Sequence, residues 1–305
     1  MSVTAILCSD LHLSHTPPLA RSGEPSWYDA MARALGELSG LVEKYNAPVI
    51  CAGDIFDRWN APPELINFAI KHLPNMYAIP GQHDLPHHRL EDIKRSAYWT
   101  LVEAEVVGHL GWKISQGVDN VDGVYVMNLH AFPWGKEIKP LEEGSKIPHI
   151  AVCHKYVWEG QHKYDGAPND ACLSKFDERL EGYDVAVFGD NHKGFVARMK
   201  DGCRIFNCGT FMRRKADEID YKPQVGLLMD NGSIRSHVLD TSKDKIEAIE
   251  KTAANDELDI AEFVEELSGL GGDSLDFETA VERYIESKGV RGEVKEMIAK
   301  LMEDV

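Results

Sequence analysis

The chain has 305 residues, of which 43% are hydrophobic and 27% are charged, a composition typical of a soluble globular protein with one large domain and an appendage or two modest domains. Its formal net charge of −17 argues against a protein that holds nucleic acid on a generally basic surface. The N-terminus lacks a secretory signal pattern and no apolar run approaches the roughly 18 residues that would cross a bilayer, so we expect no membrane association. Cys8, Cys51 and Cys153 lie within predicted buried strands, which indicates reduced core thiols and a cytoplasmic setting.

Strand and helix signals alternate through the first hundred residues. Short apolar runs predict buried strands at residues 5–8, 49–52 and 76–79. An amphipathic helix is expected over residues 27–45, and a second helix begins at Pro62-Pro63 and ends before Pro74. This order predicts parallel strands with helices packed outside them.

From about residue 106 the pattern becomes richer in strands. Strand-like runs lie at residues 112–114, 124–127, 150–153, 185–188 and 224–229. Asp230-Asn231-Gly232 follows the last of these and is a hairpin signal. Two facing sheets with helices outside fit both halves, so we predict an α/β fold with a four-layer α/β/β/α sandwich.

The C-terminal segment is acidic and has a helical pattern. Residues 241–305 hold 18 Asp and Glu against 8 Lys and Arg, a net charge of −10, which leaves −7 for residues 1–240. We therefore predict a catalytic domain over residues 1–240 and an acidic helical region over 241–305. That region either packs on the core as a solvated appendage or serves as a partner-binding module.

Each of five predicted buried strands is followed directly by a side chain able to bind a divalent cation. The residues that follow these five strands are, in order, Asp10 and His12, Asp54, Gln82 with His83 and Asp84, His154, and Asp190 with His192. Ligand sites in layered α/β proteins collect beyond the carboxyl ends of such strands. Five strand ends of this kind predict a polynuclear metal site and a metal-dependent hydrolase.

The ligand types suggest how two ions would be shared. Asp10 and His12 lie two residues apart on an extended segment, so both can face one ion. We expect His192 to bind this first ion as well. Asp54 is the expected bridging ligand, because a carboxylate has two oxygens. The second ion is expected to take the Gln82 carbonyl, His154 and Asp190. Two such ions would activate a hydroxide and clamp a phosphoryl oxygen.

His83 lies between Gln82 and Asp84 and does not need to bind metal. It is our candidate for the general acid that protonates the leaving oxygen. We expect the Asp84 carboxylate to fix the tautomer of His83.

The segments "SDLHLSH", "GDIFD", "GQHD", "CHK" and "GDNH" resemble, in order and spacing, the five signatures of calcineurin-like metallophosphoesterases. The resemblance covers roughly residues 4–230. Within that superfamily, "GDIFD" and "NCGTFMRRKADEIDYKPQVGLL" look like the SbcD-type DNA repair nucleases. That resemblance implies a manganese-dependent two-metal site, with magnesium as the other candidate ion. It also implies 3′-to-5′ exonuclease and single-strand endonuclease activity on DNA, a homodimer, and an SbcC-type ATPase partner that would dock on the C-terminal helices.

Two residues depart from the superfamily pattern. Gln82 stands where Asn is usual, and Asp190 stands where His is usual. Because Gln adds a methylene, we expect either that the second ion shifts or that the loop adjusts, and a carboxylate in place of an imidazole favours manganese or magnesium over zinc. We therefore hypothesise a weaker second metal site and an activity that needs added manganese. Retention of both ions at nanomolar affinity through dialysis against a chelator would contradict this hypothesis.

Three functions remain open at this stage: a DNA nuclease of SbcD type, a small-molecule phosphomonoesterase or phosphodiesterase with the same two metals, and a non-catalytic scaffold. The negative net charge favours the small-molecule phosphoesterase, and only Gln82 and Asp190 favour the non-catalytic scaffold. Two basic segments bear on the choice. The loop with Lys155, Tyr156, Trp158 and Lys163 either binds a nucleic-acid strand or merely packs. The run Arg213-Arg214-Lys215 either grips a DNA backbone or forms a surface turn.

Overall fold

The computed structural model describes residues 1–111, 116–117, 127–141, 146–164 and 166–246. These residues belong to one compact unit, Met1–Ile249. The predicted acidic helical region at 241–305 lies almost wholly outside the described residues, as do the predicted strand at 112–114 and most of the one at 124–127. The predicted boundary at residue 240 therefore stays a prediction.

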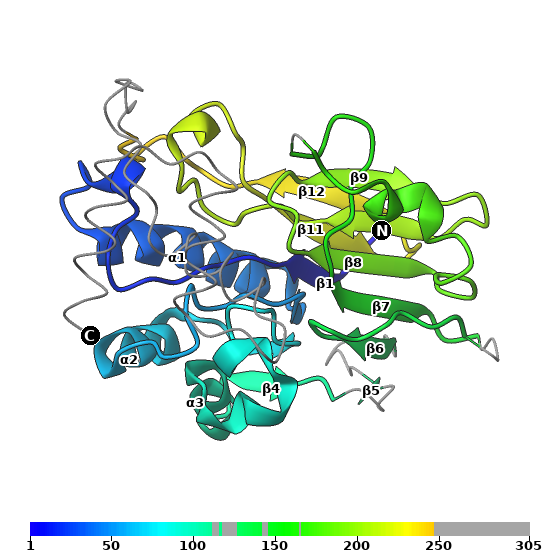
Figure 1. Cartoon of the computed structure of the whole chain (residues 1–305), viewed down its shortest axis with the longest axis horizontal. Helices are drawn as coiled ribbons and strands as arrows, with labels where there is room; N and C mark the ends of the chain where they lie inside the picture. The colour runs from blue at the N-terminus through cyan, green and yellow to red at the C-terminus, as the bar shows by residue number, and fades with distance from the viewer. Residues whose placement is uncertain (112–115, 118–126, 142–145, 165, 247–305) are drawn as a thin grey trace, which may run out of the picture. The chain divides into compact units, whose positions relative to one another are not determined.

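The first sheet has six strands in the order β12-β11-β1-β2-β3-β4. Strands β1 to β4 run parallel to one another. At one side of them β11 pairs antiparallel with β1, and β12 pairs antiparallel with β11 at the edge (Figure 1). Their bounds are β1 Val3–Cys8, β2 Val49–Cys51, β3 Met76–Ala78, β4 Val107–His109, β11 Gln224–Met229 and β12 Ile234–Val238. The predicted hairpin at Asp230-Asn231-Gly232 is confirmed, because it joins β11 to β12.

The second sheet also has six strands, in the order β5-β6-β7-β8-β10-β9. Strands β6, β7, β8 and β10 are parallel, and β5 and β9 pair antiparallel at the two edges. Their bounds are β5 Gln116–Gly117, β6 Asn128–Phe132, β7 His149–His154, β8 Val185–Gly189, β9 Phe195–Arg198 and β10 Arg204–Asn207.

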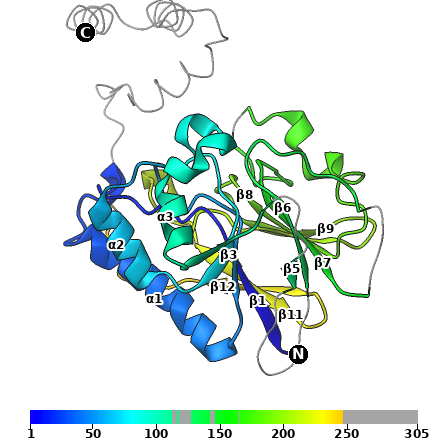
Figure 2. The same ribbon diagram turned by 90° about the horizontal axis from the view of Figure 1, so that it is seen from below.

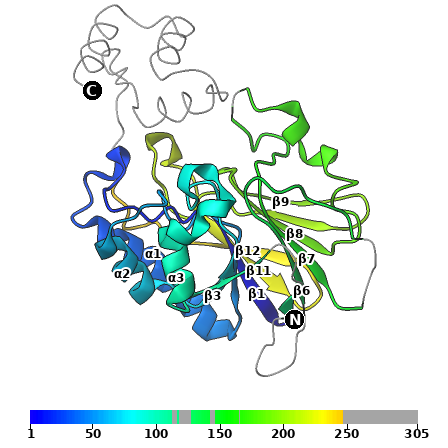
Figure 3. The same ribbon diagram turned by 60° about the horizontal axis from the view of Figure 1, so that its bottom comes forward.

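Three α-helices cover the outer face of the first sheet: α1 Trp27–Tyr45, α2 Pro63–His72 and α3 Ala97–Glu103 (Figures 2 and 3). The predicted helix at 27–45 is confirmed at both ends. Ser26 accepts the backbone N–H of Asp29 at its start, and Asn46 adopts a left-handed conformation at its end. The other helical segments among the described residues are 3-10 turns: η1 Leu19–Arg21, η2 Pro86–His88, η3 Leu90–Arg95, η4 Asn169–Ala171, η5 Leu173–Lys175 and η6 Ala216–Glu218.

Three hydrophobic cores separate the layers, and alternation along the strands builds them. Ile6 and Cys8 of β1 face the helices, whereas Ala5 and Leu7 face the second sheet. Strand β7 divides in the same way between the inner core and an outer one. A strand covered on both faces has apolar residues at every position, which explains why the sequence signal was a continuous apolar run. The mixed α/β sandwich is confirmed.

The outer face of the second sheet is covered differently from the first. In the described part of the chain its cover consists of loops and the short turns around Leu173, Phe176 and Leu180, which pack on Cys153 and Phe188. No helix among the described residues is long and apolar enough to cross a membrane.

Candidate metal centre

The five predicted strand ends meet at one place. Strands β1, β2 and β3 end there from the first sheet, and β7 and β8 end there from the second. Asp10, His12, Asp54 and Asp190 follow these strands with positive φ angles of 52°, 44°, 55° and 82°. Such angles are uncommon for residues other than glycine and cost free energy, so four of them at one site indicate a backbone held in place for function.

The first group of side chains contains Asp10, His12 and His192. The Nε2 atoms of the two histidines lie 3.2 Å apart, and Oδ1 of Asp10 lies 3.8 Å from one and 3.7 Å from the other. Asp10 and His12 are fully buried. Burial lowers the pKa of His12 well below its usual value and that of His192 to about 4, so both rings are neutral and have lone pairs for a cation.

Asp54 lies between this group and a second one. Its Oδ1 accepts the backbone N–H of His83 at 3.0 Å. Its Oδ2 is buried without a hydrogen-bond partner among the described residues, and it lies 3.7 Å from Nε2 of His12 and 3.3 Å from Nε2 of His154. The sequence suggested a bridge through both oxygens, whereas this geometry leaves Oδ2 alone to serve both groups.

The second group contains Gln82, His154 and Asp190. Oε1 of Gln82 lies 2.6 Å from Nε2 of His154, and Nε2 of Gln82 donates to Oδ1 of Asp190 at 2.9 Å. Nδ1 of His154 lies 2.6 Å from the carbonyl oxygen of Ala52, which fixes the proton of a neutral ring on Nδ1. Nε2 of His154 thus lies close to both Oε1 of Gln82 and Oδ2 of Asp54, and ligand atoms of Asp10, Asp54 and His154 all lie within 4.8 Å of one another.

These groups fit divalent cations. An orphaned buried carboxylate oxygen and converging lone pairs are costly unless a positive charge satisfies them. Burial lowers the pKa of His154, but the carboxylates of Asp54, Asp10 and Asp190 together outweigh burial, and the net pKa is raised well above its usual value. Burial also raises the pKa of Asp10 to about 7. Both raised pKa values mean that the site favours added positive charge. A metal ion bound by the oxygen and imidazole ligands would supply that charge.

His83 lies beside the first group, and one ligand atom each of His12, Asp57 and His83 lie within 4.8 Å of one another, as in a possible metal site. Its ring is 4.9 Å from the ring of His12, in an edge-to-face arrangement. Its Nδ1 lies 2.9 Å from the backbone oxygen of Asp57, which can only accept, so Nδ1 carries a proton. A proton on Nε2 as well would make the ring a cationic donor, as the proposed general acid requires.

Asp84 does not have the role that the sequence suggested. Its carboxylate accepts three backbone N–H groups, from Gly81, Ile55 and Phe56, at 3.0 to 3.2 Å. It is fully buried, and burial together with the nearby Asp54 raises its pKa to about 7. The oxygen that orients His83 belongs to the Asp57 backbone. Asp84 therefore joins the loop after β3 to the loop after β2, because its oxygens are engaged by both.

Asp57 was missed by sequence reasoning, although it is the second acid of the quoted segment "GDIFD". Its carboxylate Oδ1 lies 3.6 Å from Nδ1 of His12 and 2.7 Å from Nη2 of Arg214. Both arginines of the run Arg213-Arg214-Lys215 form contacts within the chain, and the contact of this run with a DNA backbone stays a prediction. Arg214 pairs with an acid at the site, and Arg213 binds Asp244 and the carbonyl oxygens of Ile219 and Thr241.

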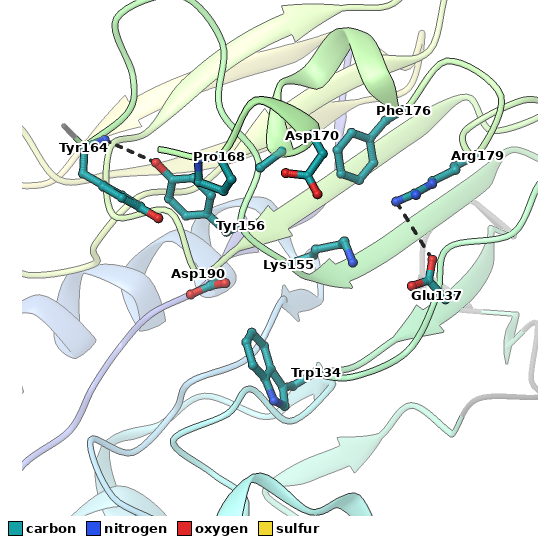
Figure 4. A pocket seen from close by; sticks show the side chains of 11 residues that line it. Trp134, Glu137, Lys155, Tyr156, Tyr164, Pro168, Asp170, Phe176, Arg179 and Asp190 are labelled. Carbon is teal, nitrogen blue, oxygen red and sulfur yellow. Dashed lines mark hydrogen bonds and ion pairs between the residues drawn. The ribbon is translucent and has the colours of Figure 1, made fainter. Parts of the chain in front are cut away.

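A pocket of about 530 Å³ opens beside the second group. Asp190 lies in its wall together with Trp134 and Tyr156, which Figure 4 shows on opposite sides of Asp190. The loop after β7 that carries Lys155 and Tyr156 therefore borders a cavity at the site.

A family model described as calcineurin-like phosphoesterase matches residues 3–194. No curated protein matches the chain. Among solved structures, a calcineurin-like phosphoesterase of Bacillus subtilis is 13% identical with a TM-score of 0.46, over 79% of this chain and 91% of that chain. A putative 5′-nucleotidase of Staphylococcus aureus is 12% identical with a TM-score of 0.44, over 86% and 58%. A phosphopantetheinyl hydrolase of Mycobacterium tuberculosis is 12% identical with a TM-score of 0.43, over 78% and 97%. At these scores the likeness says nothing about the substrate.

Proposed function

The chain belongs to the calcineurin-like phosphoesterase family, and from that premise we propose that it is a two-metal hydrolase of small, nucleotide-type phosphate esters. Asp10, His12 and His192 would hold one divalent ion, and Gln82, His154 and Asp190 the other, with Asp54 shared between them. Such ions lower the pKa of bound water and neutralise charge on a phosphoryl group. Manganese is the ion we propose, because the second group replaces an imidazole with a hard carboxylate oxygen.

The chain's own residues would move the proton. His83 would donate from Nε2 to the leaving oxygen, while the Asp57 backbone oxygen keeps the ring oriented through Nδ1. Arg214 and His12 both flank the Asp57 side chain, so they hold this loop against the site.

The observation that supports a small substrate is the pocket beside Asp190. A cavity of about 530 Å³ lies in the range of small-molecule sites. Its wall contains three acids, Glu137, Asp170 and Asp190, against two bases, Lys155 and Arg179. A nucleic-acid strand passing through it would meet more negative than positive side chains, whereas a single nucleotide would place only one or two phosphates there.

A second candidate is a manganese-dependent DNA nuclease of SbcD type, acting on single strands or ends as a homodimer with an SbcC-type ATPase. The motif resemblance favours it, and so does one contact: the ammonium of Lys163 lies 4.3 Å from the ring centroid of Trp158. Cations interleaved with aromatic rings suit single-stranded nucleic acid.

One assay separates these candidates. The protein is incubated with manganese and labelled single- or double-stranded DNA, bis(p-nitrophenyl) phosphate, AMP or ADP, with His83→Ala as the matched inactive variant. We expect turnover of one or more of the small esters and intact DNA. Degradation of DNA that His83→Ala abolishes would establish the nuclease instead, and no turnover of any substrate would leave the scaffold hypothesis.

A further inference from the structure

Asn191 stands between two candidate ligands, Asp190 of the second group and His192 of the first. It is only 2% exposed, so the polar atoms of its side chain need partners within the protein. A shift of this short segment would move ligands of both groups. The contacts of Asn191 therefore bear on both candidate ion positions.

Two partners of Asn191 belong to the loop after β7, residues 155–164. Its Nδ2 donates to the backbone oxygens of Val157 at 2.7 Å and His162 at 2.8 Å. Its Oδ1 accepts the backbone N–H of Lys193 at 3.0 Å. Carbonyl oxygens only accept hydrogen bonds and N–H groups only donate them, so the three partners define the orientation of the amide. One side chain thus connects two points of the loop to the segment that carries the ligands.

The same loop forms one wall of the pocket beside the metal centre. It follows His154, which is itself a candidate ligand, and it carries Lys155, Tyr156 and Tyr164 in the wall of the pocket (Figure 4). The hydroxyl of Tyr156 accepts the backbone N–H of Tyr164 at 3.3 Å, which connects the start of the loop to its end. The loop is therefore held at one end by the strand that bears His154 and farther along by Asn191.

The ligand segment is in turn connected to other parts of the site. The backbone N–H of Asp190 donates to the two carboxylate oxygens of Asp10, at 3.1 and 3.2 Å. Asn207, which is fully buried at the end of β10, donates from Nδ2 to the backbone oxygen of Asn191 at 2.8 Å. A cation that fixes Asp10 and Asp190 therefore also restricts Asn191.

We propose that Asn191 is a positioning residue that couples the loop after β7 to the metal centre. A cation bound by Asp190 and His192 restricts the segment between them, and Asn191 extends this restriction to Val157 and His162. Coupling between two sites is reciprocal, so the fixed loop also favours binding of the cation. This inference rests on the two-metal centre of the proposed function, and it adds how the wall of the pocket is held next to that centre.

Hydrogen exchange of the loop with and without manganese, measured by mass spectrometry, tests the coupling. The reporting N–H groups are hydrogen-bonded within the chain, and they belong to Trp158, His162, Lys163 and Tyr164. Asn191→Ala removes both bonds to the loop, whereas Asn191→Asp keeps the acceptor for Lys193 but has no donor for the loop. Ser96→Ala is the matched control, because Ser96 is 3% exposed and also bonds backbone groups, but at the start of α3.

Manganese is expected to slow exchange of these N–H groups in wild type by about tenfold, within the usual range of coupling between two sites. Asn191→Ala and Asn191→Asp should lose most of this slowing, and Ser96→Ala should retain it. Because coupling is reciprocal, the affinity of Asn191→Ala for manganese should fall by about the same factor in calorimetry. Slowing that persists in both Asn191 variants would overturn the proposal.

Calorimetry on wild type separates this inference from the proposed function. A wild type that binds no manganese would refute the two-metal function and the coupling together. Manganese binding that leaves exchange of the loop unchanged would refute the coupling alone. If Asn191→Ala does not fold, which rapid exchange throughout β7 and β8 would reveal, wild type and Asn191→Asp decide.

Discussion

At the scale of single residues, the site separates groups that would bind metal from groups that hold the ligands in place. Oδ2 of Asp54 is orphaned and faces both groups, whereas Oδ1 is occupied by the His83 backbone. Asp84 accepts three backbone N–H groups from two loops. His83 and Asp84 are adjacent in sequence but differ in role: His83 is the proposed general acid, and Asp84 holds two loops together.

This difference predicts opposite phenotypes for His83→Ala and Asp84→Asn. His83→Ala should lower kcat about 10²- to 10⁴-fold, because a general acid is lost, and cost about 1 kcal/mol or less in stability. Asp84→Asn presents an NH₂ group to a backbone donor and should cost about 1–3 kcal/mol of unfolding free energy. Urea unfolding at pH 8 in EDTA and steady-state kinetics in manganese measure both. A stable but inactive Asp84→Asn variant would instead assign Asp84 to the chemistry.

Gly81 is required by the closeness of the ligands. A Cβ atom at this position would collide with Oδ1 of Asp54 and lie 2.6 Å from Cε1 of His154. We expect Gly81→Ala to displace Asp54 and weaken manganese binding about 10- to 100-fold, as measured by calorimetry. Gly36→Ala is the matched control, because no atom lies within 4 Å of its added Cβ, and its manganese affinity should equal that of wild type. Equal affinity for all three proteins would mean that Asp54 is not a ligand.

At the scale of elements, helix α1 shows how stability is distributed away from the site. It has a capped start and buries Met31, Leu35 and Leu38 against the first sheet. Gly36 and Gly40 lie on its exposed face. Glycine in the interior of a helix costs backbone entropy without contributing a side chain, so these two positions weaken the helix.

Alanine at Gly36 and Gly40 should therefore stabilise the protein. Each substitution is expected to add about 0.5–1 kcal/mol to the free energy of unfolding, and their effects should add, since nothing lies near either Cβ. Urea unfolding of the two single variants and the double variant tests this expectation. A loss of stability would show that α1 needs the glycines for a contact with another part of the chain.

At the scale of the whole molecule, a buried charge network joins distant segments. Arg21 is 2% exposed and donates to Glu24 at 2.5 Å, to Asp244 at 3.0 Å and to the backbone oxygen of Arg213 at 2.6 Å. Glu24 also accepts the backbone N–H of Lys245 at 2.8 Å. The start of the chain thus fixes the last described residues and the segment that carries Arg214.

Removal of Arg21 should have a large effect. Arg21→Ala removes the hydrogen bonds of Arg21 to Glu24 and Asp244, which keep Arg33 and Arg213 as partners, and is expected to cost about 1.5–3 kcal/mol of stability. Arg95 provides the control, because its side chain is 63% exposed and lies 3.8 Å from Asp92, so Arg95→Ala should cost less than about 1 kcal/mol. Similar losses in both variants, measured by urea unfolding, would argue against a structural role for the network.

The sequence by itself determined the features that depend on local pattern. The strands β1, β2, β3, β7 and β8 could be predicted as apolar runs because each is buried on both faces. The helix at 27–45 could be predicted from its amphipathic spacing. The side chains that follow these strands could be grouped as candidate ligands, because parallel strands bring their carboxyl ends to one edge.

Only the tertiary structure decided what depends on contacts between distant segments. Arg214 meets Asp57 across 157 positions of sequence, and the pocket collects Trp134, Tyr156 and Asp190 from the ends of three different strands. Local periodicity does not encode such contacts. The role of Asp84 was also misread for this reason, since its nearest neighbour in sequence is His83 but its hydrogen-bond donors include the loop after β2.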